Sequence, residues 1–205
     1  MKTPKYLARR AIASQAEAAQ TLTNYLPSLE TDFRESWDWA QAIMEQDPNR
    51  RRILNASTQA AMVHDCFVTR MRTRYSDDPR VTLKATGRML RMRIDGMLSL
   101  RFKKFDSKLR SRNVKTNSQV AIYFQMEMEG IDGATDVTFG YKTDATGRKW
   151  VGMYVTCPVG WGQNKWVIVL NEEGGESGMF SFSPTTDSPD NSPIIEPKDK
   201  RKIAE

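Results

Sequence analysis

Between residues 81 and 104, apolar side chains recur at every second position, which is the spacing of a β-strand with one buried face. The alternation is interrupted at Thr86-Gly87 and again at Asp95-Gly96, where residues that favour tight turns stand. The pattern therefore predicts a three-stranded antiparallel meander over residues 81–104.

The register of this meander follows from keeping its apolar residues on one face, because a slip of one residue would move every side chain to the other face. A two-residue turn at Asp95-Gly96 would place Arg93 opposite Leu98 and mix the faces, so we expect a three-residue loop over 95–97. The pairs predicted across this loop are Ile94 with Leu98, Met92 with Leu100 and Leu90 with Phe102. For the first turn the same test favours two residues, Thr86-Gly87. The pairs predicted there are Leu83 with Leu90 and Val81 with Met92.

Residues 5–76 have helical patterning, and we expect three helices in them. Pro27 ends the first, which spans about 5–26. The second begins at Ser28 or Thr31 and ends at Asp47-Pro48, and it carries an apolar stripe at i, i+4, i+7 and i+11, namely Phe33, Trp37, Ala40 and Met44. The third spans about 57–75.

The segment 116–129 fits two structures. Val120, Ile122 and Phe124 alternate as in a strand, whereas Thr116 and Gln119 match a helical capping box and Gly130 suits a helix C-terminus. We favour the helix. Three further strands are expected near 136–142, 148–156 and 165–170.

These elements predict one α+β domain with three N-terminal helices and an antiparallel sheet of about six strands interrupted by one helix. Residues 1–79 form its helical region and residues 80–170 its sheet region. Residues 171–205 contain four prolines, and we expect them to form a disordered tail.

Positive charge is concentrated in one part of the chain. Residues 80–115 hold twelve Lys or Arg and two Asp, a net charge of +10 in a chain whose total is +6, so the rest sums to −4. Such a local excess is typical of a surface that binds a polyanion or an acidic partner. The residues predicted to bind nucleic acid are Arg88, Arg91, Arg93, Arg101, Lys103, Lys104, Lys108, Arg110, Arg112 and Lys115.

In the expected register, Arg91 faces Arg101 on the outward side of the sheet, and like charges directly across a ladder are destabilising. Two explanations stay open. Either acidic residues of the helical region, such as Glu30, Glu35 or Glu45, neutralise this face, or it contacts phosphates together with the polar loop 105–115. Two aromatic residues of the segment, Phe102 and Phe105, have the chemistry to stack on bases. The alternation assigns Phe102 to the core and leaves Phe105 open.

The sequence gives little support to catalysis. Its single histidine, His64, cannot face Cys66 two positions away on a helix, and no local motif supports Cys157 as a nucleophile. A metal-dependent nuclease would need clustered carboxylates, whereas Asp95 lies in a turn and Asp106 stands alone. We expect no catalytic residue, no metal and no cofactor.

The leading hypothesis is therefore a small non-enzymatic nucleic-acid-binding protein, with a regulatory or mobile-element role. The alternatives are a protein-interaction module of the inhibitor or antitoxin kind, whose basic face binds an acidic protein, and a divergent metal-dependent nuclease. Widely separated cysteines, Cys66 and Cys157, indicate free thiols in a reducing cytoplasm. No secretory signal or membrane span is apparent. Trp37 and Trp39 diverge on a helix, so we expect one of them to be exposed.

Overall fold

The structure is a computed structural model that describes residues 10–47, 49–86, 89–111, 116–127, 133–172 and 181–183. It has the α+β class that the sequence predicts. The helices are α1 (Gln15–Leu22), α2 (Leu26–Glu45), α3 (Arg50–Ile53), α4 (Ala56–Tyr75) and α5 (Asn117–Tyr123). The strands are β1 (Val81–Thr86), β2 (Met89–Ile94), β3 (Leu98–Lys104), β4 (Thr135–Thr143), β5 (Trp150–Gly160), β6 (Gln163–Glu172) and β7 (Ser181–Ser183).

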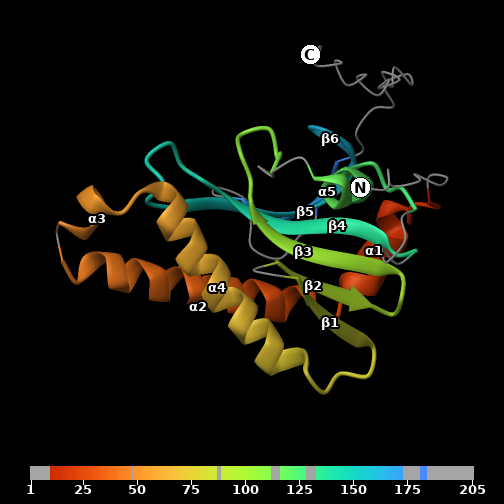
Figure 1. The fold of residues 1–205 in the computed structure, drawn as a ribbon, viewed down its shortest axis with the longest axis horizontal. Helices are drawn as coiled ribbons and strands as arrows, with labels where there is room; N and C mark the ends of the chain where they lie inside the picture. Colours follow the sequence, from red (N-terminus) through yellow and green to blue (C-terminus); the bar gives the residue numbers. More distant parts are fainter. Residues whose placement is uncertain are drawn as a thin grey trace, which may run out of the picture.

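The strands form one seven-stranded sheet whose spatial order follows the sequence, from β1 at one edge to β7 at the other (Figure 1). Neighbouring strands are antiparallel except β3 and β4, which are parallel. The sheet is therefore mostly antiparallel, as predicted, and it differs from the prediction at this one pair. Parallel neighbours need a crossover connection, and α5 lies within that connection.

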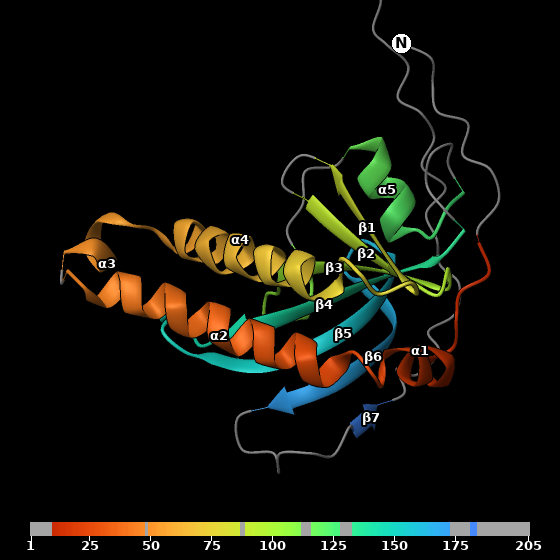
Figure 2. The same ribbon diagram turned by 90° about the horizontal axis from the view of Figure 1, so that it is seen from below.

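The two faces of the sheet have different cover. Figure 2 shows α2 and α4 side by side on one face and α5 on the other. Aromatic residues of both long helices pack on the first face: Phe33 of α2 lies 4.9 Å from Tyr141 and Phe67 of α4 lies 4.2 Å from Phe102, measured between ring centroids. One buried apolar cluster joins the helical and sheet regions, and it includes the predicted α2 stripe up to Ala40.

The helix boundaries show which local signals decide where a helix begins. α1 begins after Ser14, whose side chain and that of Glu17 form a capping box. The helix predicted over 5–26 is therefore too long at both ends, and its residues 5–9 lie outside the described part. Pro27 does not end a helix. It stands in the first turn of α2, where a missing N–H costs nothing.

The second hairpin of the meander has the predicted register. Ile94 pairs with Leu98, and Met92 pairs with Leu100. The first hairpin differs by two residues, since Leu83 pairs with Met92 rather than Leu90. A shift of two residues keeps the same side chains on the same face, so the parity test cannot detect it.

The remaining predictions agree with the structure in part. The helix favoured over 116–129 is present as α5, with Thr116 as its N-cap, but it ends at Tyr123. Gly130 lies outside the described residues. β6 continues to Glu172, and residues 181–183 pair with it as β7, so the sheet extends past the predicted boundary at 171. The rest of the predicted tail lies outside the described residues.

Candidate nucleic-acid interface

The face of the sheet that carries α5 also carries a row of cations. The register places Lys84 of β1 opposite Arg91 of β2, and Arg91 opposite Arg101 of β3. Because neighbouring strands lie about 4.8 Å apart, this row spans about 10 Å of backbone. Two further cations follow along β3 and β4 on the same face. We call the five residues Lys84, Arg91, Arg101, Lys103 and Lys142 the basic face.

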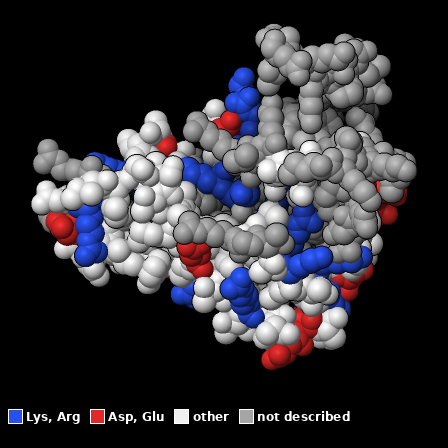
Figure 3. Space-filling model, viewed as in Figure 1, with Lys and Arg blue, Asp and Glu red and all other residues white. Residues whose placement is uncertain are grey.

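Figure 3, drawn in the orientation of Figure 1, shows Lys and Arg side chains in a hollow near the middle of the view, with few acidic groups around them. Lys84 is exposed, and Arg91, Lys103 and Lys142 are partly exposed. Among the described residues, none of these four cations has a carboxylate within ion-pair distance.

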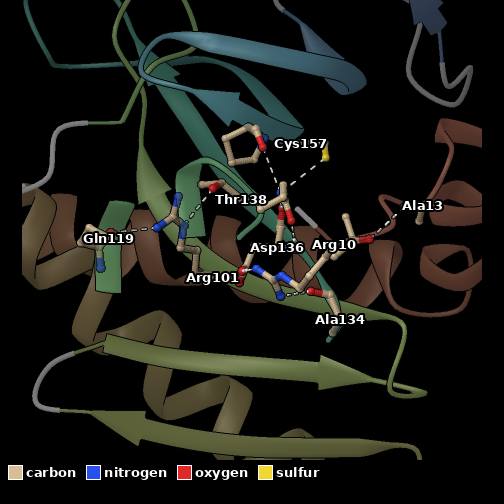
Figure 4. Close-up of polar contacts among 11 residues, drawn as sticks. Arg10, Ala13, Arg101, Gln119, Ala134, Asp136, Thr138 and Cys157 are labelled. Atoms are coloured by element: carbon tan, nitrogen blue, oxygen red, sulfur yellow. Dashed lines mark hydrogen bonds and ion pairs between the residues drawn. The ribbon is translucent and has the colours of Figure 1, made fainter. Parts of the chain in front are cut away.

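Arg101 lies on the predicted face but is not a surface residue, so its prediction as a solvent-facing binding residue is wrong. Its exposed fraction is 2%, because α5 covers it. The guanidinium donates from Nε to Thr138 Oγ1 and from Nη1 to Gln119 Oε1, both at 3.0 Å (Figure 4). It also lies 4.6 Å from the Tyr123 ring centroid. Its Nη2 has no hydrogen-bond partner among the described residues.

Burial changes the proton affinity of this region. Desolvation lowers the pKa of Arg101. Desolvation also lowers the pKa of Lys103, and repulsion from the nearby Arg101 charge lowers it further. The acidic side chains suggested as neutralising groups do not serve here, because they belong to α2 on the opposite face. Glu30 pairs with Arg34 on its own helix, and Glu35 pairs with Arg70 of α4.

The other predicted cations have different positions. Arg93 shares the face of Arg91 and donates to Gly96 O at 3.4 Å. Strand alternation places Lys104 on the opposite face, at the end of β3, where burial lowers its pKa. Arg88, Arg112 and Lys115 lie outside the described residues.

Asp106 holds the loop after β3 together. Its carboxylate accepts from the backbone N–H groups of Lys108 and Arg110 and forms an ion pair with the Arg110 side chain at 2.8 Å. Lys108 and Arg110 are both exposed. Phe105 is buried against Tyr154 at a centroid distance of 6.4 Å, so it cannot stack on a base. Phe102 belongs to the core, as expected.

A buried polar network beside the basic face was not predicted from the sequence. Arg10 forms an ion pair with Asp136 at 2.6 Å and donates to the Ala134 carbonyl (Figure 4). Gln125 donates to the backbone carbonyls of Asp136 and Pro158. These contacts join residues up to 126 positions apart, and no local pattern reports such distances.

Trp161 stands in the turn between β5 and β6, and it is partly exposed. Its ring centroid lies 4.5 Å from that of Tyr123 and 6.1 Å from that of Phe124. The side chain of Arg110 packs beside the neighbouring Gly162, whose φ of +77° is one that glycine adopts readily. An aromatic group and an exposed cation thus lie next to α5, the helix that covers Arg101.

The described residues contain no group of three His, Cys, Asp or Glu that could hold a metal ion. The His64 ring contacts its neighbour Asp65 at 3.1 Å. Cys66 and Cys157 are free thiols, and burial raises the pKa of Cys157 to about 12. A thiol with that pKa is a poor nucleophile at neutral pH.

Comparison with protein-family models, curated proteins and solved structures finds no match to this chain. In the part of the chain that the structure describes, no helix is both long and apolar enough to cross a bilayer.

Proposed function

We propose that this chain is a non-enzymatic nucleic-acid-binding protein that contacts phosphates through the basic face and the adjoining loop. The observation that carries the proposal is the row of cations on this face, with Arg91 directly opposite Arg101 and, among the described residues, no carboxylate within ion-pair distance of Lys84, Arg91, Lys103 or Lys142. Like charges at such positions destabilise a sheet by roughly 0.2–1 kcal/mol. A polyanion bound at the exposed cations of this face would offset this repulsion, and the buried Arg101 would add to the attraction.

The buried Arg101 supports the same function. Its guanidinium is held by Thr138 and Gln119 and lies against the Tyr123 ring, so its charge has a fixed position. Arg101 also adds positive potential beneath Arg91 and Lys103 in surroundings less polar than water. Lys108 extends the positive surface onto the loop, where Arg110 is paired with Asp106. Free thiols suit a cytoplasmic location, which remains a prediction.

A salt titration tests the proposal. Labelled single- and double-stranded DNA and RNA are bound to the protein from roughly 50 to 200 mM salt, where phosphate contacts weaken sharply. The test variant is Arg91→Gln/Lys103→Gln/Lys142→Gln. The control is Arg72→Gln/Arg148→Gln/Lys149→Gln, which removes the same charge from exposed positions elsewhere.

We expect log affinity to fall linearly with log salt for the wild type and the control. The test variant should have a slope shallower by about 2, because each phosphate contact to a single strand contributes about 0.7. Absence of binding to every nucleic acid at the lowest salt would refute the proposal, and so would equal slopes for the two variants.

A second candidate is a protein-interaction module, favoured by exposed apolar residues on the helices. Trp39 of α2 is 47% exposed, as expected for one of the two neighbouring tryptophans, and Ile53 of α3 is 76% exposed. Figure 1 shows α3 at the tip of the helical layer, beyond the sheet. A pull-down with Trp39→Ser/Ile53→Ser and with the basic-face variant tests this. Partner capture that neither variant reduces would exclude both surfaces.

A further inference from the structure

The surroundings of Trp161 indicate which form of nucleic acid suits this surface. The Tyr123 ring contacts both Arg101 and Trp161. The Arg101 guanidinium lies 4.6 Å from the Tyr123 ring centroid, and the Trp161 ring centroid lies 4.5 Å from it. Trp161 is therefore separated from Arg101, the β3 member of the cation row, by one aromatic ring. A strand whose phosphates lie on the row can reach the indole with a base.

The loop after β3 supplies charge next to this indole. A side chain at Gly162 would come within 2.9 Å of Arg110 Cδ, so the arginine stem lies directly against the turn that holds Trp161. Three hydrogen bonds with Asp106 hold Arg110 in place. The Arg110 backbone N–H donates to Asp106 Oδ1, and its Nε donates to Oδ2. The Asp106 backbone N–H donates to the Arg110 carbonyl. An exposed cation thus has a defined position beside a partly exposed aromatic ring.

We propose that the nucleic acid bound by this surface is single-stranded, with its backbone on the basic face and one base stacked on Trp161. This inference rests on the proposed function. Positive grooves bordered by aromatic rings bind single strands because unpaired bases expose their faces, which a duplex keeps stacked inside.

Anisotropy with one labelled sequence, as single-stranded DNA, single-stranded RNA and the matching duplexes, tests the strand preference. Trp161→Ala is compared with Trp39→Ala, which removes an exposed tryptophan from α2 instead. We expect single strands to bind more tightly than duplexes. Trp161→Ala should weaken single-strand binding about tenfold without changing the salt slope, because stacking releases no counterions. Trp39→Ala should leave binding unchanged.

A second measurement uses the wild-type protein and so does not depend on how Trp161→Ala folds. Photocrosslinking with a 5-bromouracil-substituted single strand, followed by peptide mapping, should place the crosslink at Trp161. Duplex binding as tight as single-strand binding, or a crosslink only at other residues, would overturn the inference while leaving the proposed function standing. Failure of every nucleic acid to bind would remove the proposed function itself.

Discussion

Gln125 offers the sharpest test of how the structure holds the basic face together. Its side chain is fully buried, and its amide nitrogen donates to the carbonyls of Asp136 at 2.7 Å and Pro158 at 2.9 Å. Its Oε1 accepts from the Asp136 N–H at 2.9 Å, and its own backbone carbonyl accepts from the Arg10 N–H. One residue just after α5 thus joins the N-terminal segment, β4 and β5.

Gln125→Met keeps the length of the side chain but removes its polar atoms. Three buried backbone groups then lose their partners, and each costs roughly 1–3 kcal/mol. With some relaxation around the site, we expect the free energy of unfolding to fall by roughly 3–6 kcal/mol. A typical domain has about 5–15 kcal/mol in total, so the melting temperature should fall by more than about 6 °C.

Urea denaturation followed by circular dichroism measures this loss. The control is Gln20→Met, at an exposed position of α1, which should change stability by no more than about 0.5 kcal/mol. If Gln125→Met stayed within about 1 kcal/mol of this control, the three hydrogen bonds could not have the importance that their geometry indicates.

Two further predictions concern the edge of the basic face. A Cβ on Gly140 would overlap the Lys103 carbonyl oxygen and lie 2.7 Å from Phe105 Cε2. Gly140→Ala should therefore lower the free energy of unfolding by roughly 3 kcal/mol or more. The control Gly133→Ala places a Cβ with nothing within 4 Å, so it should be nearly neutral in the same urea assay. Burial lowers the folded-state pKa of Lys103 below its usual 10.5, so the folded state binds fewer protons than the unfolded state between those two values. The free energy of unfolding should therefore rise with pH across that window, and Lys103→Met should make the rise smaller; an unchanged rise would contradict this assignment.

Arg101 shows what strand periodicity can predict about a side chain and what it cannot. Alternation along β3 correctly separated Arg101 from Leu100 and Phe102, because side chains of a strand point to opposite faces in turn. The same pattern says nothing about what covers each face. α5 lies over Arg101 because the chain crosses over to make β4 parallel to β3, and only the tertiary structure contains that information.

The candidate site divides in the same way. The local excess of charge at Arg91, Lys103 and Lys108 is readable from the sequence, whereas the contribution of Lys142 depends on β4 pairing with β3. Trp161 is visible in the sequence as a tryptophan in a Gly-flanked turn. Its closeness to Arg101 through Tyr123 requires three separate elements to meet.

By itself, the sequence determined the α+β class, the meander, the long amphipathic helices and the concentration of positive charge, because periodicity and turn chemistry act between residues close in the chain. The tertiary structure decided the parallel step, the burial of Arg101 and Phe105, and the network around Gln125. Those features depend on contacts between distant residues, whose free energy arises only when the whole sheet assembles.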